Sequence, residues 1–294
     1  MAGMEVIDRL TLADGTRLHL RAWSAPDQPY GRLLIVHGLG EHGGRYAHVA
    51  QALGAAGWAV HAFDLRGHGD SDGPRGAVPR HDALCVDLAA VIDHLRADEG
   101  PFAGPFVLLG HSMGGLLAAR FVAESLAEVP APWARAVDAL VLSSPALDTG
   151  LGAAQRLQLW VGERLLPDRP LPNGLKPQWV SRDPQVVRDY IADPKVHDRI
   201  SARLARFIVD EGAAVIGAAP RWRVPTLLMW AGADRCVAPA GSAAFAAVAP
   251  PTVVQHRCFD GLAHEIFNEP ERAEVLARLA GWLAGFKAGG APRA

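Results

Sequence analysis

Two segments of the sequence have the pattern Gly-x-Ser-x-Gly, which can present a serine hydroxyl as a nucleophile. Residues 110–114 follow the apolar run 106–109 and continue directly into a segment with helical spacing. A strand that turns sharply into a helix at the serine is a nucleophile elbow, where the helix N-terminus also favours developing negative charge. The other match, residues 69–73, lies in a polar loop and runs into Pro74. We therefore expect Ser112 to be a catalytic nucleophile and residues 69–73 to be a turn.

The base that would activate this serine is sought among the histidines that follow it. A serine hydroxyl is a weak nucleophile until a histidine takes its proton, and a carboxylate must orient that histidine. After an elbow serine, the acid and then the histidine follow in chain order, each after a strand. His197 lies in a helical region and His256 inside a predicted strand, whereas His264 lies in the loop after that strand. His264 is the expected base.

Three aspartates are candidates for the orienting acid. Asp234 follows the predicted strand 226–230, Asp148 follows the preceding strand, and Asp260 lies close to His264 but next to a glycine that suits a turn. We favour Asp234, because its strand is the first after a long helical stretch and best fits the acid's place in the chain order. Asp148 is the main alternative.

Acyl transfer also needs two backbone N–H groups that bind the oxyanion. One donor is the residue after the nucleophile, Met113, and the other belongs to the loop after the third strand, where Leu39 is best placed. Such a mechanism uses no metal and no organic cofactor, and we expect neither.

The same loop carries an alternative interpretation. Residues 38–43 match Gly-x-Gly-x-x-Gly after a strand and before a helix, and Asp64 ends the next strand about twenty residues on, as in a dinucleotide-binding site. A dehydrogenase would leave the elbow at Ser112 without an explanation. It would also not account for the long helical stretch that follows residue 145.

The elements that must position these residues alternate between short apolar strands and helices. Two alternating segments flank the turn 13–15 and predict a hairpin, and the later strands and helices predict a parallel sheet with helices on both faces. The expected strands are 5–12, 16–23, 32–36, 58–63, 106–109, 136–142, 226–230 and 252–258, and the expected helices are 45–56, 82–98, 113–126, 241–248 and 271–286.

This alternation stops at Pro145 and resumes after Pro225. Residues 146–220 contain amphipathic helical pieces and no clear strand. We therefore predict one α/β core domain, residues 1–145 and 221–294, interrupted by a helical cap, or lid, at 146–220. The cap surface could guide an acyl chain, touch a membrane or simply pack on the core. Its apolar residues include Leu157, Leu159, Trp160, Val161, Leu165 and Leu166.

The composition narrows the function. The 294 residues include 29 Lys and Arg against 31 Asp and Glu, a net charge of −2, which argues against a nucleic-acid partner. The three cysteines, an odd number, argue against a disulfide framework and suit a reducing compartment. No apolar run reads as a secretion signal or a membrane span, so we expect a cytoplasmic protein, with peripheral contact to a membrane surface as an open possibility.

Several motifs together resemble the α/β-hydrolase family, and within it the monoacylglycerol lipase and lysophospholipase branch. The matching segments are residues 36–46, 64–73, 110–115, 143–145, 193–194, 232–234 and 261–265. The resemblance implies a mostly parallel eight-stranded sheet with a helical cap insertion, Ser112, Asp234 and His264 as the triad, and Leu39 and Met113 at the oxyanion.

The resemblance also implies residues for the head group of a lipid. Glu41, Arg45 and Tyr190 match positions at the polar end of the pocket that receive glycerol, and His111 is expected to contact substrate as well. For Glu41 and Arg45 a purely structural role at a helix start is an equally good interpretation.

The expected activity is hydrolysis of a small lipid ester, a monoacylglycerol or a lysophospholipid, through an acyl-enzyme. Two alternatives of the same fold are a general carboxylesterase and a serine aminopeptidase. An alternative of another class is a protein that uses the pocket only to bind a small molecule.

Overall fold

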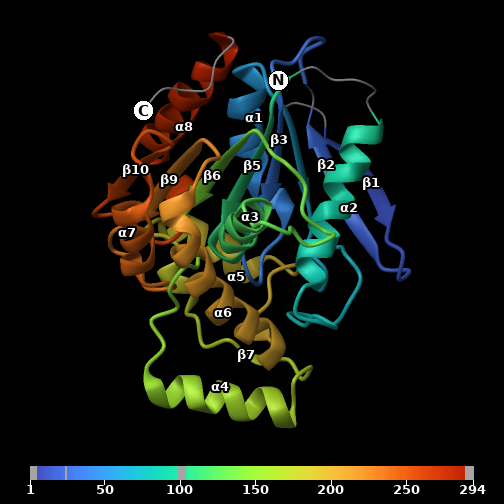
Figure 1. Ribbon diagram of the computed structural model, residues 1–294, viewed down its shortest axis with the longest axis vertical. Coiled ribbons are helices and arrows are strands. Elements are labelled where there is room, and N and C mark those ends of the chain that lie inside the picture. The colour runs from blue at the N-terminus through green and yellow to red at the C-terminus, as the bar shows by residue number, and fades with distance from the viewer. Residues whose placement is uncertain (1–4, 24, 99–103, 289–294) are drawn as a thin grey trace.

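An eight-stranded sheet organises the chain in the computed structural model, which describes residues 5–23, 25–98 and 104–288 (Figure 1). The strand order is β1-β2-β4-β3-β5-β6-β9-β10. β1 pairs antiparallel with β2 and β2 antiparallel with β4, whereas all later pairings in this sheet are parallel. The strands are β1 Glu5–Thr11, β2 Arg17–Trp23, β3 Arg32–Val36, β4 Ala59–Phe63, β5 Phe106–His111, β6 Ala139–Ser143, β9 Thr226–Ala231 and β10 Val254–Phe259. The predicted mostly parallel sheet of eight strands is confirmed.

The sheet is covered on both faces, and its central strands β3, β4, β5, β6 and β9 are mostly apolar and buried at every position. Successive side chains of a strand point to opposite faces, so Leu33 and Ile35 of β3 face one helical layer, and Leu34 and Val36 face the other. α1 (Ala47–Ala55) and α8 (Arg272–Ala284) cover the first face. The helices that contribute to the second core are α2 Ala83–Asp98, α3 Ser112–Ser125, α6 Ala202–Ala218 and α7 Pro239–Val248.

The chain between β6 and β9 adds elements that lie outside the main sheet. α4 has no buried residue and projects at one end of the molecule (Figure 1), whereas α6 packs against α3 and buries Leu204 and Phe207 in the core. Two-residue strands β7 and β8 pair with each other, which the sequence did not predict, because so short a pairing leaves no alternation to detect. The elements here are α4 Ala153–Leu165, β7 Leu171–Pro172, α5 Pro184–Ala192, β8 Arg199–Ile200 and α6.

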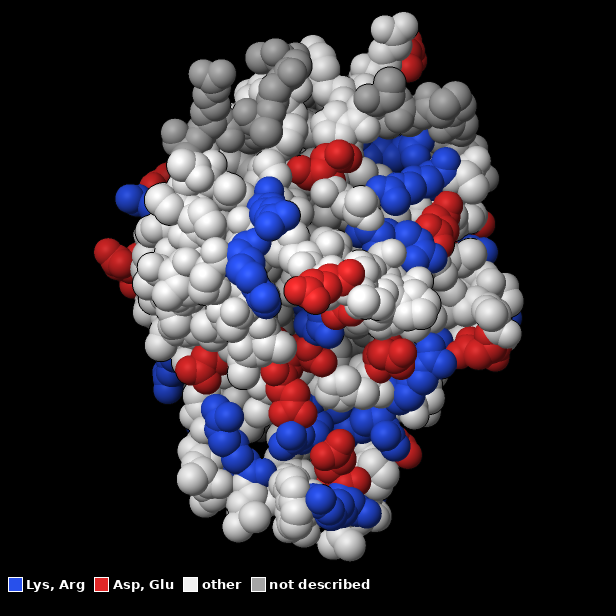
Figure 2. All heavy atoms as spheres, viewed as in Figure 1, with Lys and Arg blue, Asp and Glu red and all other residues white. Residues whose placement is uncertain are grey.

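Two surface properties bear on the partners of the protein. On the face shown in Figure 2, acidic and basic side chains are interspersed and form no continuous basic stripe. Within the described residues, no helix combines the length and the apolar character that crossing a bilayer requires.

Candidate active site

Ser112 lies at the sharp turn between β5 and α3. Its φ of 52° is left-handed, which is strained for a residue with a Cβ and is the backbone form of a nucleophile elbow. The flanking glycines are required by close backbone approach. A Cβ on Gly110 would lie 2.4 Å from the carbonyl oxygen of Gly114, and one on Gly114 would lie 2.2 Å from that of Val36. The turn thus needs the small residues that the motif supplies.

His264 and Asp234 lie beside this serine, each on a loop at the carboxyl end of a strand. The His264 Nε2 is 2.9 Å from the Ser112 Oγ, and its Nδ1 is 2.6 Å from the Asp234 Oδ2. A carboxylate can only accept, so Nδ1 carries the proton and the neutral ring presents Nε2 as an acceptor to the serine hydroxyl. The three side chains therefore have the arrangement of a serine nucleophile, its base and the orienting acid.

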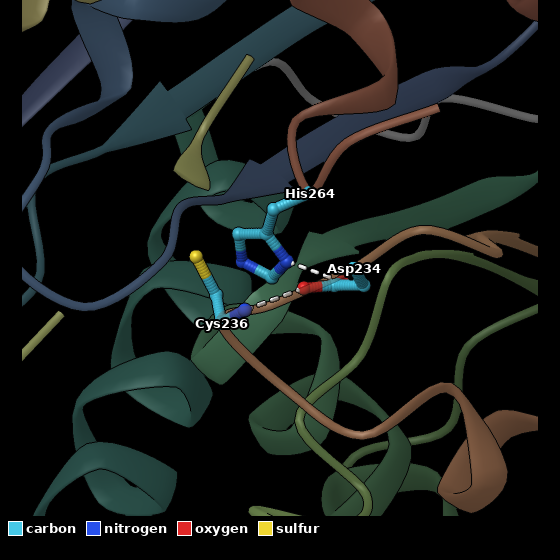
Figure 3. Close-up of side chains that lie close together, drawn as sticks. All are labelled: Asp234, Cys236 and His264. Carbon is cyan, nitrogen blue, oxygen red and sulfur yellow. Dashed lines mark hydrogen bonds and ion pairs between the residues drawn. The ribbon is translucent and has the colours of Figure 1, made fainter. Parts of the chain in front are cut away.

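Backbone amides fix the acid, as Figure 3 shows for one of them. The Asp234 Oδ1 accepts from the N–H of Cys236 at 2.8 Å and of Val237 at 3.1 Å, which leaves Oδ2 for His264. The Cys236 side chain lies beside the imidazole in Figure 3, and burial raises the pKa of its thiol. Cys236, which is partly buried, is thus a protonated neighbour of Asp234 and His264.

The charges around His264 favour its protonated form. Burial alone would lower the pKa of His264, but the Asp234 carboxylate, and then Glu265 and Glu41, outweigh it and raise the pKa above its ordinary value. A histidine that takes a proton from serine becomes an imidazolium, so the same carboxylates stabilise the charge that forms during attack.

The loop after β3, which contains the predicted oxyanion donor Leu39, lies close to Ser112, and the other predicted donor, Met113, directly follows that serine. A Cβ on Gly38 would lie 3.0 Å from the Ser112 Cβ, which shows how closely this loop approaches the elbow. Met113 is in the first turn of α3, where backbone N–H groups have no acceptor within the helix. Among the hydrogen bonds of the described residues, the Leu39 amide has no backbone or side-chain acceptor. Both amides thus remain available to an oxyanion.

Protein groups occupy two further amides of this loop, those of Gly38 and Gly43. Gly38 N–H donates to the Glu41 Oε1 at 2.6 Å, and Gly43 N–H donates to the Asp64 Oδ1 at 2.8 Å. Asp64 is fully buried and accepts from the Asp70 N–H as well. A dinucleotide site would use these amides for phosphate and this acid for a ribose hydroxyl, so the structure disfavours the dehydrogenase interpretation.

Glu41, Arg45 and Tyr190 come together at one end of the site. The Glu41 Oε2 accepts from the Arg45 Nη1 at 2.6 Å, and the Tyr190 ring lies 4.8 Å from the Arg45 guanidinium carbon. Glu41 Oε1 also accepts from the Tyr46 hydroxyl at 2.8 Å. Coulomb attraction from Arg45 outweighs the cost of burial and lowers the pKa of Glu41 to about 2. Glu41 is therefore a carboxylate that also braces the oxyanion loop.

The Arg45 guanidinium has a second partner that the sequence pattern did not assign. Glu265 accepts from both terminal nitrogens of Arg45, at 2.6 Å from Nη1 and 2.7 Å from Nη2. The two residues are 220 positions apart, so no local spacing could have paired them. The only signal in the sequence is that Glu265 follows His264 directly.

His111 lies behind the serine, between the pocket and β6. Its Nδ1 is 3.1 Å from the Ser143 Oγ, and its ring centre is 4.7 Å from that of His264. Burial, and then the neighbouring His264, lower the pKa of His111 to about 4, so the ring is neutral at neutral pH.

The alternative residues lie in other settings. Asp148 Oδ1 accepts from the Gly150 N–H at 2.8 Å, and the His256 ring on β10 is tilted by 36° against the Trp230 ring on β9, with ring centres 5.8 Å apart. His197 lines the pocket, yet its N–H donates to the Gly40 carbonyl at 2.9 Å and its Nε2 bonds to the Gly67 carbonyl. The segment 69–73 is a turn, as predicted, with its Ser71 hydroxyl bonded to the Asp64 carbonyl.

A pocket of about 510 Å³ opens over the triad. That volume suits a small organic molecule. One part of its wall is polar and includes Glu41 and Glu265, and another is apolar and includes Leu175, Val180 and Ile191. The remaining lining residues are Gly38, Leu39, His111, Ser112, Asn173, Lys176, Pro177, Tyr190, Val196, His197, Asp198, Cys236 and His264.

Comparisons with known proteins agree with this fold. Residues 27–271 match the model of the family described as serine aminopeptidase, S33. A protein of Mycolicibacterium smegmatis named monoacylglycerol lipase is 35% identical over 272 residues, which cover 92% of this chain and 93% of that protein. A Bacillus subtilis protein named phospholipase YtpA is 29% identical and is covered over 95% of its length.

A solved structure shows the same likeness. The crystal structure of the Paleococcus ferrophilus monoacylglycerol lipase has a TM-score of 0.80 and 32% identity, with 92% of this chain and 99% of that one covered. The sheet, the elbow and the pocket define an α/β-hydrolase. The chain belongs to the α/β-hydrolase family that the serine aminopeptidase model describes, and it is similar to the monoacylglycerol lipases within it.

Proposed function

We propose that this ester hydrolase cleaves monoacylglycerols through an acyl-enzyme formed on Ser112. The observation that carries the proposal is the continuous chain of hydrogen bonds from the Asp234 carboxylate through His264 to the Ser112 hydroxyl. The similarity to proteins named monoacylglycerol lipase supports the choice of substrate.

In the first step, His264 Nε2 takes the Ser112 proton while Oγ attacks the ester carbonyl. The Leu39 and Met113 N–H groups bind the oxyanion, and Asp234 holds the imidazole in the tautomer that accepts. His264 then gives the proton to the glycerol oxygen, which leaves. In the second step, His264 activates water, which attacks the acyl-enzyme and releases the fatty acid.

We further propose that residues 146–220 act as a cap that receives the acyl chain and contacts a lipid surface. Five apolar residues of this segment line the pocket, namely Leu175, Pro177, Val180, Ile191 and Val196. On and beside α4, apolar side chains are exposed to solvent, among them Leu157, Leu165 and Leu166. An amphipathic helix that exposes apolar side chains is suited to meeting a lipid surface.

Ser112→Ala tests the proposed nucleophile. It should abolish turnover of monooleoylglycerol and labelling by a fluorophosphonate, because both need the same hydroxyl, while the thermal melting profile stays close to wild type. Ser125→Ala in α3 is the matched control, since that hydroxyl donates to the Val122 carbonyl one turn earlier in the same helix and should be dispensable. Retained turnover in Ser112→Ala would overturn the assignment.

A substrate panel on the wild-type protein tests the substrate class. Monooleoylglycerol should be cleaved with a higher kcat/KM than lysophosphatidylcholine or an aminoacyl amide. Preference for the amide would support an aminopeptidase instead. A protein that binds monooleoylglycerol but neither cleaves any of the three nor labels with fluorophosphonate would be a binding protein.

A further inference from the structure

We infer that Glu265 makes the pocket selective for neutral head groups and against anionic ones. Together with Glu41, it places two negative charges around the single positive charge of Arg45 at this part of the pocket. The inference rests on the proposed monoacylglycerol hydrolysis and adds the residue that sets its head-group preference. It starts from an apparent contradiction, since an arginine near an active site usually recognises phosphate or carboxylate.

Arg45 is not free to bind an anionic ligand, because two carboxylates of the protein already bind its guanidinium. Glu265 binds Nη1 and Nη2 in the two-pronged geometry that a carboxylate or phosphate ligand would itself use, and Glu41 takes a further contact to Nη1. The Tyr190 ring covers one face of the guanidinium. All three charged side chains are nearly buried, with at most 11% of each exposed. The group therefore carries a net charge of −1 in a poorly hydrated place.

Other elements also hold Glu265 in position. The Asn268 side-chain amide donates to the Glu265 Oε2 at 2.8 Å. The Glu265 backbone N–H donates to the Val180 carbonyl of the proposed cap, also at 2.8 Å. The carboxylate cannot turn away when a ligand enters without breaking several of these contacts. It is thus a fixed negative charge on the pocket wall, one residue from His264.

The remaining charged groups of the lining do not reverse this sign. Asp198 adds a carboxylate, paired with Arg199 at 3.1 Å, and Lys176 is exposed and lies 5.7 Å from the Trp179 ring centre. Burial lowers the pKa of both His111 and His197 to about 4, so neither is a cation at neutral pH. Asp198 and Arg199 cancel as a pair, and the one lysine among the described lining residues is exposed to solvent, so the buried group of Glu41, Arg45 and Glu265 keeps its net charge of −1.

The glycerol of a bound ester lies only a few bonds from the carbonyl that Ser112 attacks. A phosphate on that glycerol would bring its charge into the same small pocket, where like charges repel strongly because little water screens them. A neutral glycerol meets no such repulsion, and its hydroxyls can donate hydrogen bonds to the carboxylates. The expected discrimination is roughly tenfold or more in kcat/KM for each like charge met at close range.

Glu265→Gln is the direct test, with two substrates of one acyl chain: monodecanoylglycerol and monodecanoylglycerol phosphate, both below the concentration at which micelles form. The wild type should prefer the neutral ester. The variant should raise the ratio of the phosphate ester's kcat/KM to that of the neutral ester by roughly tenfold. Glu265→Asp, which keeps the charge with a shorter reach, should lower both rates and leave the ratio near the wild-type value.

Glu274→Gln on α8 is the matched control. It removes one exposed carboxylate from the molecule and so changes the net charge equally, and it should leave the ratio unchanged. Labelling by a neutral fluorophosphonate shows that each variant holds a folded site. A wild-type ratio in Glu265→Gln would overturn the inference and leave Glu265 as a brace for Arg45. If the wild type cleaved neither ester, the proposed function itself would fail, which is a different result.

Discussion

At the scale of single residues, the carboxylates around His264 give the site a pH dependence. The base must be neutral to accept the serine proton, so activity is lost as the pH falls through the pKa of His264. Because Asp234, Glu265 and Glu41 outweigh the effect of burial and raise that pKa, the acid limb of the kcat/KM profile should lie higher than for an isolated histidine. Each carboxylate removed should move the limb to lower pH.

Asp234→Asn tests this directly and also tests the choice of acid. The amide can no longer favour the accepting tautomer or stabilise the imidazolium, so kcat should fall about 10⁴-fold. The acid limb of the residual activity should move to lower pH, as measured by kcat/KM against pH. Asp148→Asn is the control, because that carboxylate bonds to the Gly150 N–H within its own turn. A large loss in Asp148→Asn, with Asp234→Asn active, would reverse the assignment.

How far the sequence predicts such residues depends on whether local context reveals them. Ser112 is visible because strand, turn and helix are consecutive, and His264 because its loop follows a strand. Glu265 is not, because its role comes from a contact with Arg45 220 positions away. The sequence also could not decide between the two roles of Glu41. The Gly38 N–H and the Tyr46 hydroxyl meet at one of its carboxylate oxygens only in the folded chain.

At the scale of elements, the chain between β6 and β9 is attached to the core unevenly. The segment after α5 is tied to the loop after β3, through the His42 Nε2 and Asp193 Oδ2 at 2.8 Å and through the His197 N–H and the Gly40 carbonyl. α4 packs on α6 and leaves Leu157 and Leu165 more than half exposed. The segment after α5 is therefore fixed to the loop that holds the proposed oxyanion donor Leu39, and α4 is the exposed part that we propose meets a lipid surface.

The double variant Leu157→Glu with Leu165→Glu tests the role of α4. Two added charges should weaken binding to phosphatidylcholine and phosphatidylglycerol vesicles in a sedimentation assay, because charged side chains do not enter the apolar part of an interface. Hydrolysis of a short soluble ester should be unchanged, and stability should change by about 0.5 kcal/mol or less per site. Val129→Glu, at another exposed apolar position, is the control. Equal vesicle binding by all three proteins would exclude this contact.

At the scale of the whole molecule, the sheet is the part that the sequence predicts best. Its central strands are short apolar runs whose alternate residues fill two cores, one under α1 and α8 and one under α3 and α6. The pairing of β7 with β8 and the packing of α6 on α3 were not predicted, because both depend on which distant surfaces meet. Ser112 begins α3 directly after β5, and Asp234 and His264 lie on the loops after β9 and β10, so the sheet positions the proposed triad without contributing a side chain from its own interior.

Because the proposed catalytic residues lie beyond the strand ends, we predict that a substitution in the core can lower stability without lowering the catalytic rate. Leu228, in β9, is fully buried, and Leu228→Ala should lower the free energy of unfolding by about 2–5 kcal/mol, because it leaves a cavity that the sheet cannot close. Denaturant unfolding of the full chain measures the loss, with Val129→Ala as an exposed control of small effect. The rate per active site, counted by fluorophosphonate titration well below the melting temperature, should stay near wild type, because β9 carries Asp234 on the loop beyond its end. A proportionate loss of rate per titrated site would instead show that strain in the core reaches the triad, and that the loops do not hold Ser112, His264 and Asp234 in place independently of the interior.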